Sequence, residues 1–153
     1  MSTKVFVVED DDLTRELLCE MVSSSSELAL VGQAAAPAEA LALVAEAAPD
    51  LVLVDLALGD ESGIELIASL RKTLPNADLI AHTVFDDREN VFSALKAGAV
   101  SYLLKGSPPQ ALVNALLEVR AGGAPMSPKI ARLVIRDLQT SEDALSPRER
   151  QIL

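Results

Sequence analysis

Residues 51–54 are four consecutive aliphatic residues, LVLV, and a carboxylate, Asp55, follows them directly. A run as apolar as this is typical of a strand that is buried on both faces, inside a parallel sheet. An acid at the end of such a strand is either an ordinary turn residue or a reactive group held at the edge of a rigid sheet. The rest of the sequence decides between these two interpretations.

Short apolar runs alternate with segments of helical periodicity along the first 121 residues. The expected strands are 5–8, 28–32, 51–54, 79–82 and 100–104, and the expected helices lie near 12–23, 37–48, 63–73, 87–97 and 108–121. This alternation predicts an α/β fold with a parallel sheet covered on both faces. The sequence EDDD after the first strand would repel a pyrophosphate, which disfavours the dinucleotide-binding order. We therefore expect a flavodoxin-like, doubly wound five-stranded sheet of order 2-1-3-4-5.

Composition and charge restrict the class of protein. The single cysteine, Cys19, excludes an internal disulfide framework, and no window reaches the roughly 18 apolar residues of a membrane span, so a cytoplasmic protein without a membrane segment is expected. Residues 1–119 hold 19 acidic and seven basic residues, whereas residues 120–153 hold four and six. Because the acidic part repels a phosphate backbone, DNA is expected to contact only the C-terminal end or a segment beyond it.

Polar residues stand at the C-terminal ends of four predicted strands. Glu9 and Asp10 follow the first strand and Asp55 the third, and these strands are neighbours in the order 2-1-3-4-5. Three carboxylates in one crevice require a cation, and Mg²⁺ prefers oxygen ligands. Thr83 and Lys105 add a hydroxyl and an ammonium at the same edge. This set suits the formation of an aspartyl phosphate, for which positioning and charge neutralisation supply most of the catalysis.

Longer motifs surround these residues: VFVVEDD, LVLVDLALGDESGIEL, ALKAGAVSYLLKGSPPQAL, GGAPMSPKIA and LSPRERQIL. With them the sequence resembles a response-regulator receiver domain of the LuxR/NarL-type two-component transcriptional regulators. The resemblance implies a CheY-like fold followed by a linker helix. It also implies that Asp55 is the phosphoacceptor, and that Glu9, Asp10, Asp55 and the Ala57 carbonyl hold Mg²⁺.

The same resemblance implies switch residues and partners. Thr83 would bond the phosphoryl group, Lys105 would contact it, and Tyr102 would be the aromatic residue that rotates inward. The phosphoryl donor would be a sensor histidine kinase, and phosphorylation would favour a homodimer. DNA would be bound only through a C-terminal domain that is absent from this chain.

Three parts are expected along the chain. Residues 1–121 would form the receiver domain, and residues 122–143 a linker with one helix near 127–138, which follows the breaker cluster GGAP. QTSEDA, residues 139–144, is interpreted as a flexible joint. Residues 144–153 resemble the first helix of a LuxR-type helix-turn-helix domain and are expected to begin a truncated second domain.

Some residues depart from the family pattern. Glu9 replaces the more usual aspartate but keeps the oxygen ligand, and Gly59 stands where a proline is common, which suggests a looser loop. Ala57 and Phe85 lie two residues after the phosphoacceptor and the switch threonine. Neither side chain can orient an attacking water, so we expect the phosphorylated form to hydrolyse slowly.

Two other functions remain open at this point. One is a receiver-like interaction module that switches without phosphate. The other is a metal-dependent phosphatase with an aspartate nucleophile, which needs a second acid where this chain has Ala57, so no turnover enzyme is expected. Outside the site, we expect His82 to be a packed histidine rather than a proton shuttle, and Cys19 to be a buried thiol.

Overall fold

The computed structural model describes the backbone of residues 2–152 and the side chains of residues 2–140. Five parallel strands form the main sheet in the order β2-β1-β3-β6-β7, which confirms the predicted flavodoxin-like, CheY-like topology. Its strands are β1 (Thr3–Val8), β2 (Leu28–Ala34), β3 (Leu51–Val54), β6 (Asp78–Thr83) and β7 (Ala99–Leu104). The helices are α1 (Asp12–Ser24), α2 (Pro37–Ala47), α3 (Gly63–Thr73), α4 (Arg88–Ala97), α5 (Pro109–Arg120) and α6 (Pro128–Ile152). Within residues 2–152, no helix combines the length and the apolar character needed to cross a membrane.

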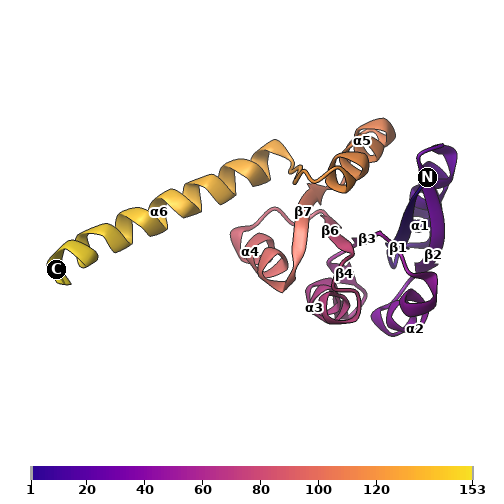
Figure 1. The fold of residues 1–153 in the computed structure, drawn as a ribbon, viewed down its shortest axis with the longest axis horizontal. Coiled ribbons are helices and arrows are strands. Elements are labelled where there is room, and N and C mark those ends of the chain that lie inside the picture. Colours follow the sequence, from indigo (N-terminus) through magenta and orange to yellow (C-terminus); the bar gives the residue numbers. More distant parts are fainter. Residues whose placement is uncertain (1, 153) are drawn as a thin grey trace.

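Helices α1 and α5 cover one face of the sheet, and α2, α3 and α4 cover the other (Figure 1). Successive side chains of a strand point to opposite faces. Val5 and Val7 of β1 therefore pack with α1 and α5, whereas Phe6 and Val8 pack with α2, α3 and α4. All four residues of β3 are buried, which explains why its sequence is an unbroken apolar run.

Strand register brings the predicted acids to one edge of the sheet. Val8 of β1 pairs with Val54 of β3, so the next residue of each strand, Glu9 and Asp55, leaves the sheet at the same level. The Asp55 amide donates a hydrogen bond to the Val8 carbonyl at 3.0 Å, which fixes the start of the loop after β3. β6 lies on the other side of β3, and β7 lies beside β6, so four strand ends meet at this edge.

The segment after Asp55 is a short hairpin that the sequence pattern did not predict. β4 (Ala57–Leu58) pairs antiparallel with β5 (Glu61–Ser62) across a two-residue turn. Gly59 takes a positive φ of 64° at the first turn position, where glycine is favoured. Its amide donates to Asp10 Oδ2 at 2.9 Å. In place of the looser loop that Gly59 suggested, the structure has a paired hairpin bonded to the acid cluster.

The C-terminal part differs from the expected division. α6 is one helix from Pro128 to Ile152 that extends past α4 and away from the sheet (Figure 1). The prediction of a flexible joint at 139–144 is wrong, because the backbone of these residues is helical and continues as the same helix up to Ile152. The physical reason is that residues 129–146 contain neither glycine nor proline to stop the helix. The assignment of residues 144–153 to a second domain stays a prediction, and residue 153 lies outside the described residues.

Candidate functional site

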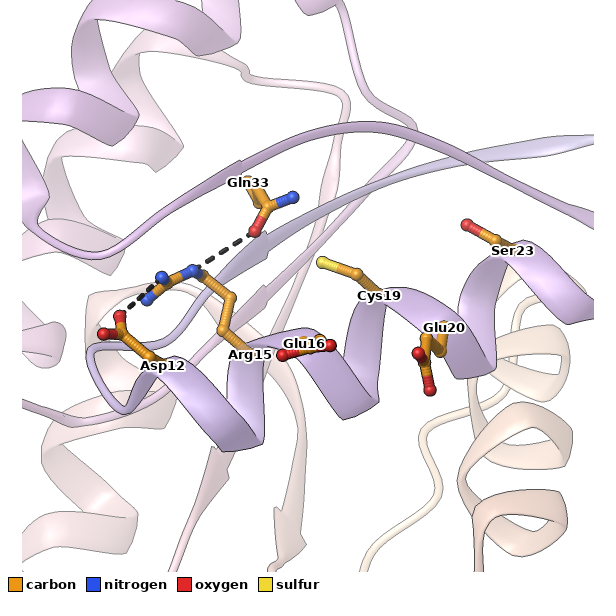
Figure 2. Close-up of a pocket in the computed structure, with 7 residues that line it drawn as sticks. All are labelled: Asp12, Arg15, Glu16, Cys19, Glu20, Ser23 and Gln33. Carbon is orange, nitrogen blue, oxygen red and sulfur yellow. Dashed lines mark hydrogen bonds and ion pairs between the residues drawn. The ribbon is translucent and has the colours of Figure 1, made fainter.

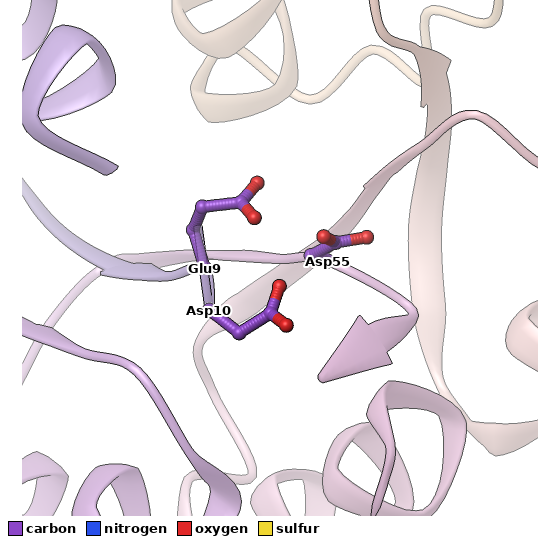
Figure 3. A group of neighbouring side chains, drawn as sticks. All are labelled: Glu9, Asp10 and Asp55. Carbon is purple, nitrogen blue, oxygen red and sulfur yellow. The ribbon is translucent and has the colours of Figure 1, made fainter. Parts of the chain in front are cut away.

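The three acids predicted to share a cation converge in the structure. Figure 3 shows Glu9, Asp10 and Asp55 around one space, and each offers a carboxylate oxygen within 4.8 Å of the others. Glu9 is 1% exposed and Asp55 5% exposed, whereas Asp10 is open to solvent. Oxygen ligands at this spacing fit one hard divalent cation.

Lys105 enters the same pocket from the end of β7. Its Nζ lies 2.7 Å from Glu9 Oε1 and 2.9 Å from Asp55 Oδ2. The backbone of Lys105 is held there because its amide donates to the Thr83 carbonyl at 2.8 Å. Burial alone would lower the pKa of Lys105, but the ion pairs with Glu9 and Asp55 raise it above the ordinary lysine value. The ammonium therefore stays charged and forms ion pairs with both buried acids.

Glu9 is the acid whose protonation is most perturbed. Burial raises its pKa to about 7; the contact with Lys105 opposes this shift and the nearby Asp55 carboxylate adds to it. Oε1 of Glu9 has no well-aligned hydrogen bond among the described residues, although the Lys105 ammonium is close. The carboxylate oxygens of Glu9, Asp10 and Asp55 converge within 4.8 Å of one another, which fits a divalent cation, so the donor set agrees with the metal site predicted from the sequence.

The other predicted residues lie at or beside the same edge. Thr83 ends β6, is fully buried, and accepts a hydrogen bond from the Phe85 amide at 3.3 Å. Tyr102 is already buried, and its hydroxyl donates to the Phe85 carbonyl at 2.7 Å, so the inward position is the one observed. The Ala57 amide donates to Asp55 Oδ1 at 3.2 Å, while the role of the Ala57 carbonyl as a metal ligand stays a prediction.

Comparison with known proteins identifies the family. The model of the response regulator receiver domain matches residues 5–117. This chain belongs to the response regulator receiver family. Receiver domains of response regulators are not turnover enzymes, which excludes the phosphatase interpretation.

Relatives of this receiver domain include LuxR- and NarL-type regulators. The response regulator protein VraR of Staphylococcus aureus is 31% identical over 156 residues, covering 100% of this chain and 75% of VraR. A LuxR-family response regulator from Aurantimonas sp. SI85-9A1 superposes with a TM-score of 0.82 at 31% identity, over 90% of this chain and 98% of that one. The receiver domain of the putative response regulator NarL from Mycobacterium tuberculosis superposes with a TM-score of 0.75 at 30% identity. The match covers 80% of this chain and 98% of that one.

Arg15 supports the acid cluster of this receiver domain from α1. Its guanidinium donates to the Glu9 carbonyl at 2.9 Å. It also donates to Asp12 Oδ1 at 2.7 Å and to Gln33 Oε1 at 3.2 Å (Figure 2). Arg15 thereby ties α1 to β2 and to the end of β1. The sequence analysis missed this residue because a single arginine on a helix carries no recognisable pattern.

Gly63 was also missed as a determinant of the site. It is the first residue of α3, where a Cβ atom would lie 2.0 Å from the Asp55 carbonyl oxygen and 2.6 Å from Leu56 Cα. The close approach is fixed by the Gly63 amide, which donates to the Leu56 carbonyl at 2.9 Å. Ser62 caps the helix by accepting hydrogen bonds from the Ile64 and Glu65 amides. Only glycine lets α3 begin this close to Asp55.

His82 and Cys19, which lie outside the group of predicted site residues, are buried as the sequence predicted. His82 is buried, and burial together with the nearby Lys105 charge lowers its pKa to about 4. Cys19 is buried in α1, and burial raises the pKa of its thiol. His82 is therefore neutral at physiological pH, and the Cys19 thiol remains protonated.

His82 should make the stability of the protein depend on pH. Its folded pKa lies below the ordinary value near 6.5, so between these two values only the unfolded chain binds the proton. The free energy of unfolding should therefore fall as the pH drops from about 6.5 toward 4, with a contribution from His82 of about 2 kcal/mol at pH 5. Urea unfolding of the wild type and of His82→Leu measures this contribution. Identical pH profiles for the two proteins would contradict it.

Proposed function

We propose that Asp55 accepts a phosphoryl group from a sensor histidine kinase in the cytoplasm, with Mg²⁺ as cofactor. The observation that supports this most is the Lys105 ammonium, which bridges Asp55 and Glu9 beside Asp10. A nucleophilic carboxylate, an oxygen site for a divalent cation and a permanent positive charge are thus in one pocket.

The chemistry follows from the positions of the acids. A carboxylate oxygen of Asp55 attacks phosphorus, the P–N bond of the phosphohistidine breaks, and its electron pair stays on the imidazole nitrogen. Glu9, Asp10, Asp55 and the Ala57 carbonyl would hold Mg²⁺, which when bound neutralises charge on the phosphoryl oxygens. The Asp55 carboxylate is held on both oxygens, by Lys105 at 2.9 Å and by the Ala57 amide at 3.2 Å, which orients it for attack.

Phosphorylation then changes the balance between two conformations. Lys105 exchanges an Asp55 oxygen for a phosphoryl oxygen, and the Thr83 hydroxyl turns to donate to another. Thr83 now accepts from the Phe85 amide, so its reorientation alters the start of the loop to which the Tyr102 hydroxyl is bonded. This population shift would favour a homodimer and control transcription through a C-terminal DNA-binding domain.

Acetyl phosphate labelling tests the proposal. With Mg²⁺, intact mass should rise by one phosphoryl group in the wild type, and Asp55→Asn should remain unlabelled. A label that persists in Asp55→Asn would refute Asp55 as the phosphoacceptor. Absence of both labelling and a response to beryllofluoride in the wild type would favour the phosphate-independent interaction module.

The raised pKa of Glu9 should make Mg²⁺ binding depend on pH. The cation has to displace the proton from Glu9, so affinity should increase about tenfold between pH 6 and pH 8 and level off above. Calorimetric titration of Mg²⁺ at several pH values measures this. Glu9→Gln should bind more weakly and without this pH dependence. A wild-type affinity that is flat across the range would contradict a proton on Glu9.

The phosphorylated form should be long-lived. Ala57 and Phe85 offer no group that orients water, and Phe85 is half-buried against the core beside Thr83. Phe85→Gln, which introduces such a group, should accelerate loss of the label about tenfold or more. Time courses of the labelled protein in Mg²⁺ buffer measure both rates, with Phe92→Gln on α4 as the matched control. Loss of the wild-type label within seconds would refute the expectation.

A further inference from the structure

The segment before α6 is bonded to the edge strand of the sheet. Tyr102 of β7 and Met126 form a parallel β-bridge, and the Ser127 amide donates to the Tyr102 carbonyl at 3.4 Å. The Leu104 amide donates to the Ser127 hydroxyl at 3.0 Å. Ser127 also accepts, through its carbonyl, the first hydrogen bonds of α6, from the amides of residues 130 and 131. The start of α6 is therefore fixed to the end of β7.

The first half of α6 also packs on α4 and on the loop before it. Ile130 is 0% exposed and belongs to the same apolar cluster as Tyr102. Lys129 forms an ion pair with Asp86, and Asp137 forms one with Arg88, the first residue of α4. One buried anchor thus lies between two ion pairs, and beyond them the helix leaves the body of the fold (Figure 1).

These contacts fall on the two segments that carry the proposed phosphate contacts. Leu104, which bonds to Ser127, directly precedes Lys105. Asp86, which pairs with Lys129, lies three residues after Thr83 in the loop that Tyr102 also holds. With α6 docked, Lys105 already reaches Asp55.

We propose that docking of residues 125–137 on β7 and α4 is coupled to occupation of Asp55. A phosphoryl group gains its full contacts only when the end of β7 and the β6–α4 loop are both in place, and the docked segment holds both. Occupation of Asp55 therefore strengthens docking, and docking strengthens binding at Asp55 by the same factor, because coupling between two sites is reciprocal. This inference rests on the proposed function, and it makes the first half of α6 the element that reports the phosphorylation state.

The docked first half of α6 is held by two exposed ion pairs and one buried anchor. Arg88 and Lys129 are largely exposed, and exposed pairs contribute little each. Ile130 is the fully buried anchor, and Leu133 and Val134 pack on the same apolar cluster while staying partly exposed. A modest contribution from the phosphate site is therefore sufficient to change the docked fraction.

Hydrogen exchange on the intact chain tests the coupling without any substitution. Beryllofluoride, which stands in for the phosphoryl group on a carboxylate, should slow exchange of the amides of residues 130–137 about fivefold or more in the presence of Mg²⁺. Asp55→Asn should show no change. Unchanged exchange in these amides while beryllofluoride is bound would overturn the inference and leave the proposed function intact. Failure of beryllofluoride to bind the wild type would overturn both.

A charge-reversal cycle tests the reciprocal effect. Arg88→Asp and Asp137→Arg each bring like charges together outside the acid pocket, and the double variant restores an ion pair of opposite polarity. The affinity for beryllofluoride should fall about threefold to tenfold in each single variant and recover in the double variant. Equal affinities in all four proteins would overturn the coupling.

Discussion

Replacing Lys105 with methionine is expected to lower the free energy of unfolding by about 3 kcal/mol at pH 8 in the absence of Mg²⁺. The Lys105 ammonium is the cation seen on two acids that are almost completely buried, Glu9 and Asp55. Without it, two neighbouring carboxylates are left buried and uncompensated. Their repulsion grows with pH as Glu9 loses its proton, at a pKa above the value of about 7 that the contact with Lys105 holds down in the wild type. Urea unfolding at about pH 6 and pH 8 measures the loss.

Mg²⁺ should reverse much of this effect, because a cation in the acid cluster replaces the missing positive charge. Lys96→Met, which removes an exposed lysine from the last turn of α4, is the matched control and should change stability by less than about 0.5 kcal/mol. If Lys105→Met were as stable as the wild type at pH 8 without Mg²⁺, the ion pairs of Lys105 would not hold the pocket together.

The substitution Gly63→Ala is expected to cost about 3 kcal/mol and to displace Asp55. A methyl group at this position would sit 2.0 Å from the Asp55 carbonyl oxygen, which is backbone and cannot rotate away. Relief requires α3 to move from the end of β3, and that movement shifts Asp55. Labelling by acetyl phosphate should therefore slow strongly in the variant, even under conditions where it remains folded by circular dichroism.

Gly59→Ala separates this steric effect from the ordinary cost of losing a glycine. Gly59 has a φ of 64°, and a Cβ atom there would meet no neighbour within 4 Å. Its replacement should cost about 1 kcal/mol, which is the strain of a left-handed conformation. Equal losses of stability in the two variants would contradict the close approach of α3 to Asp55.

The sheet order and the acid cluster could be predicted because both follow from short sequence patterns: apolar runs that mark the strands, and the residue that follows each run. The LVLV run marks a strand buried on both faces, and parallel register places the residue after each strand at one edge. Once that edge is defined, Glu9, Asp10 and Asp55 have to be neighbours. Lys105 follows by the same reasoning from the end of β7.

The supporting contacts could not be predicted in this way, because they depend on distances between elements. Arg15 meets the Glu9 carbonyl only because α1 packs at one particular angle, and Gly63 matters only because α3 starts against β3. Polar composition suggested a joint at 139–144, but residues 129–146 contain neither glycine nor proline, so the backbone of α6 continues through them. Packing of α6 on α4 through Ile130 likewise has no local signal beyond helical periodicity.

The most direct test of the pocket is a crystal structure of the protein with Mn²⁺ and beryllofluoride, in which anomalous scattering locates the metal. One Mn²⁺ ion should lie between Asp10 and Asp55 at about 2.1 Å from their oxygens, with Glu9 in or next to its ligand shell. The Lys105 ammonium should contact a fluorine of the beryllofluoride on Asp55. A metal ion bound elsewhere, or beryllofluoride bound away from Asp55, would contradict the account.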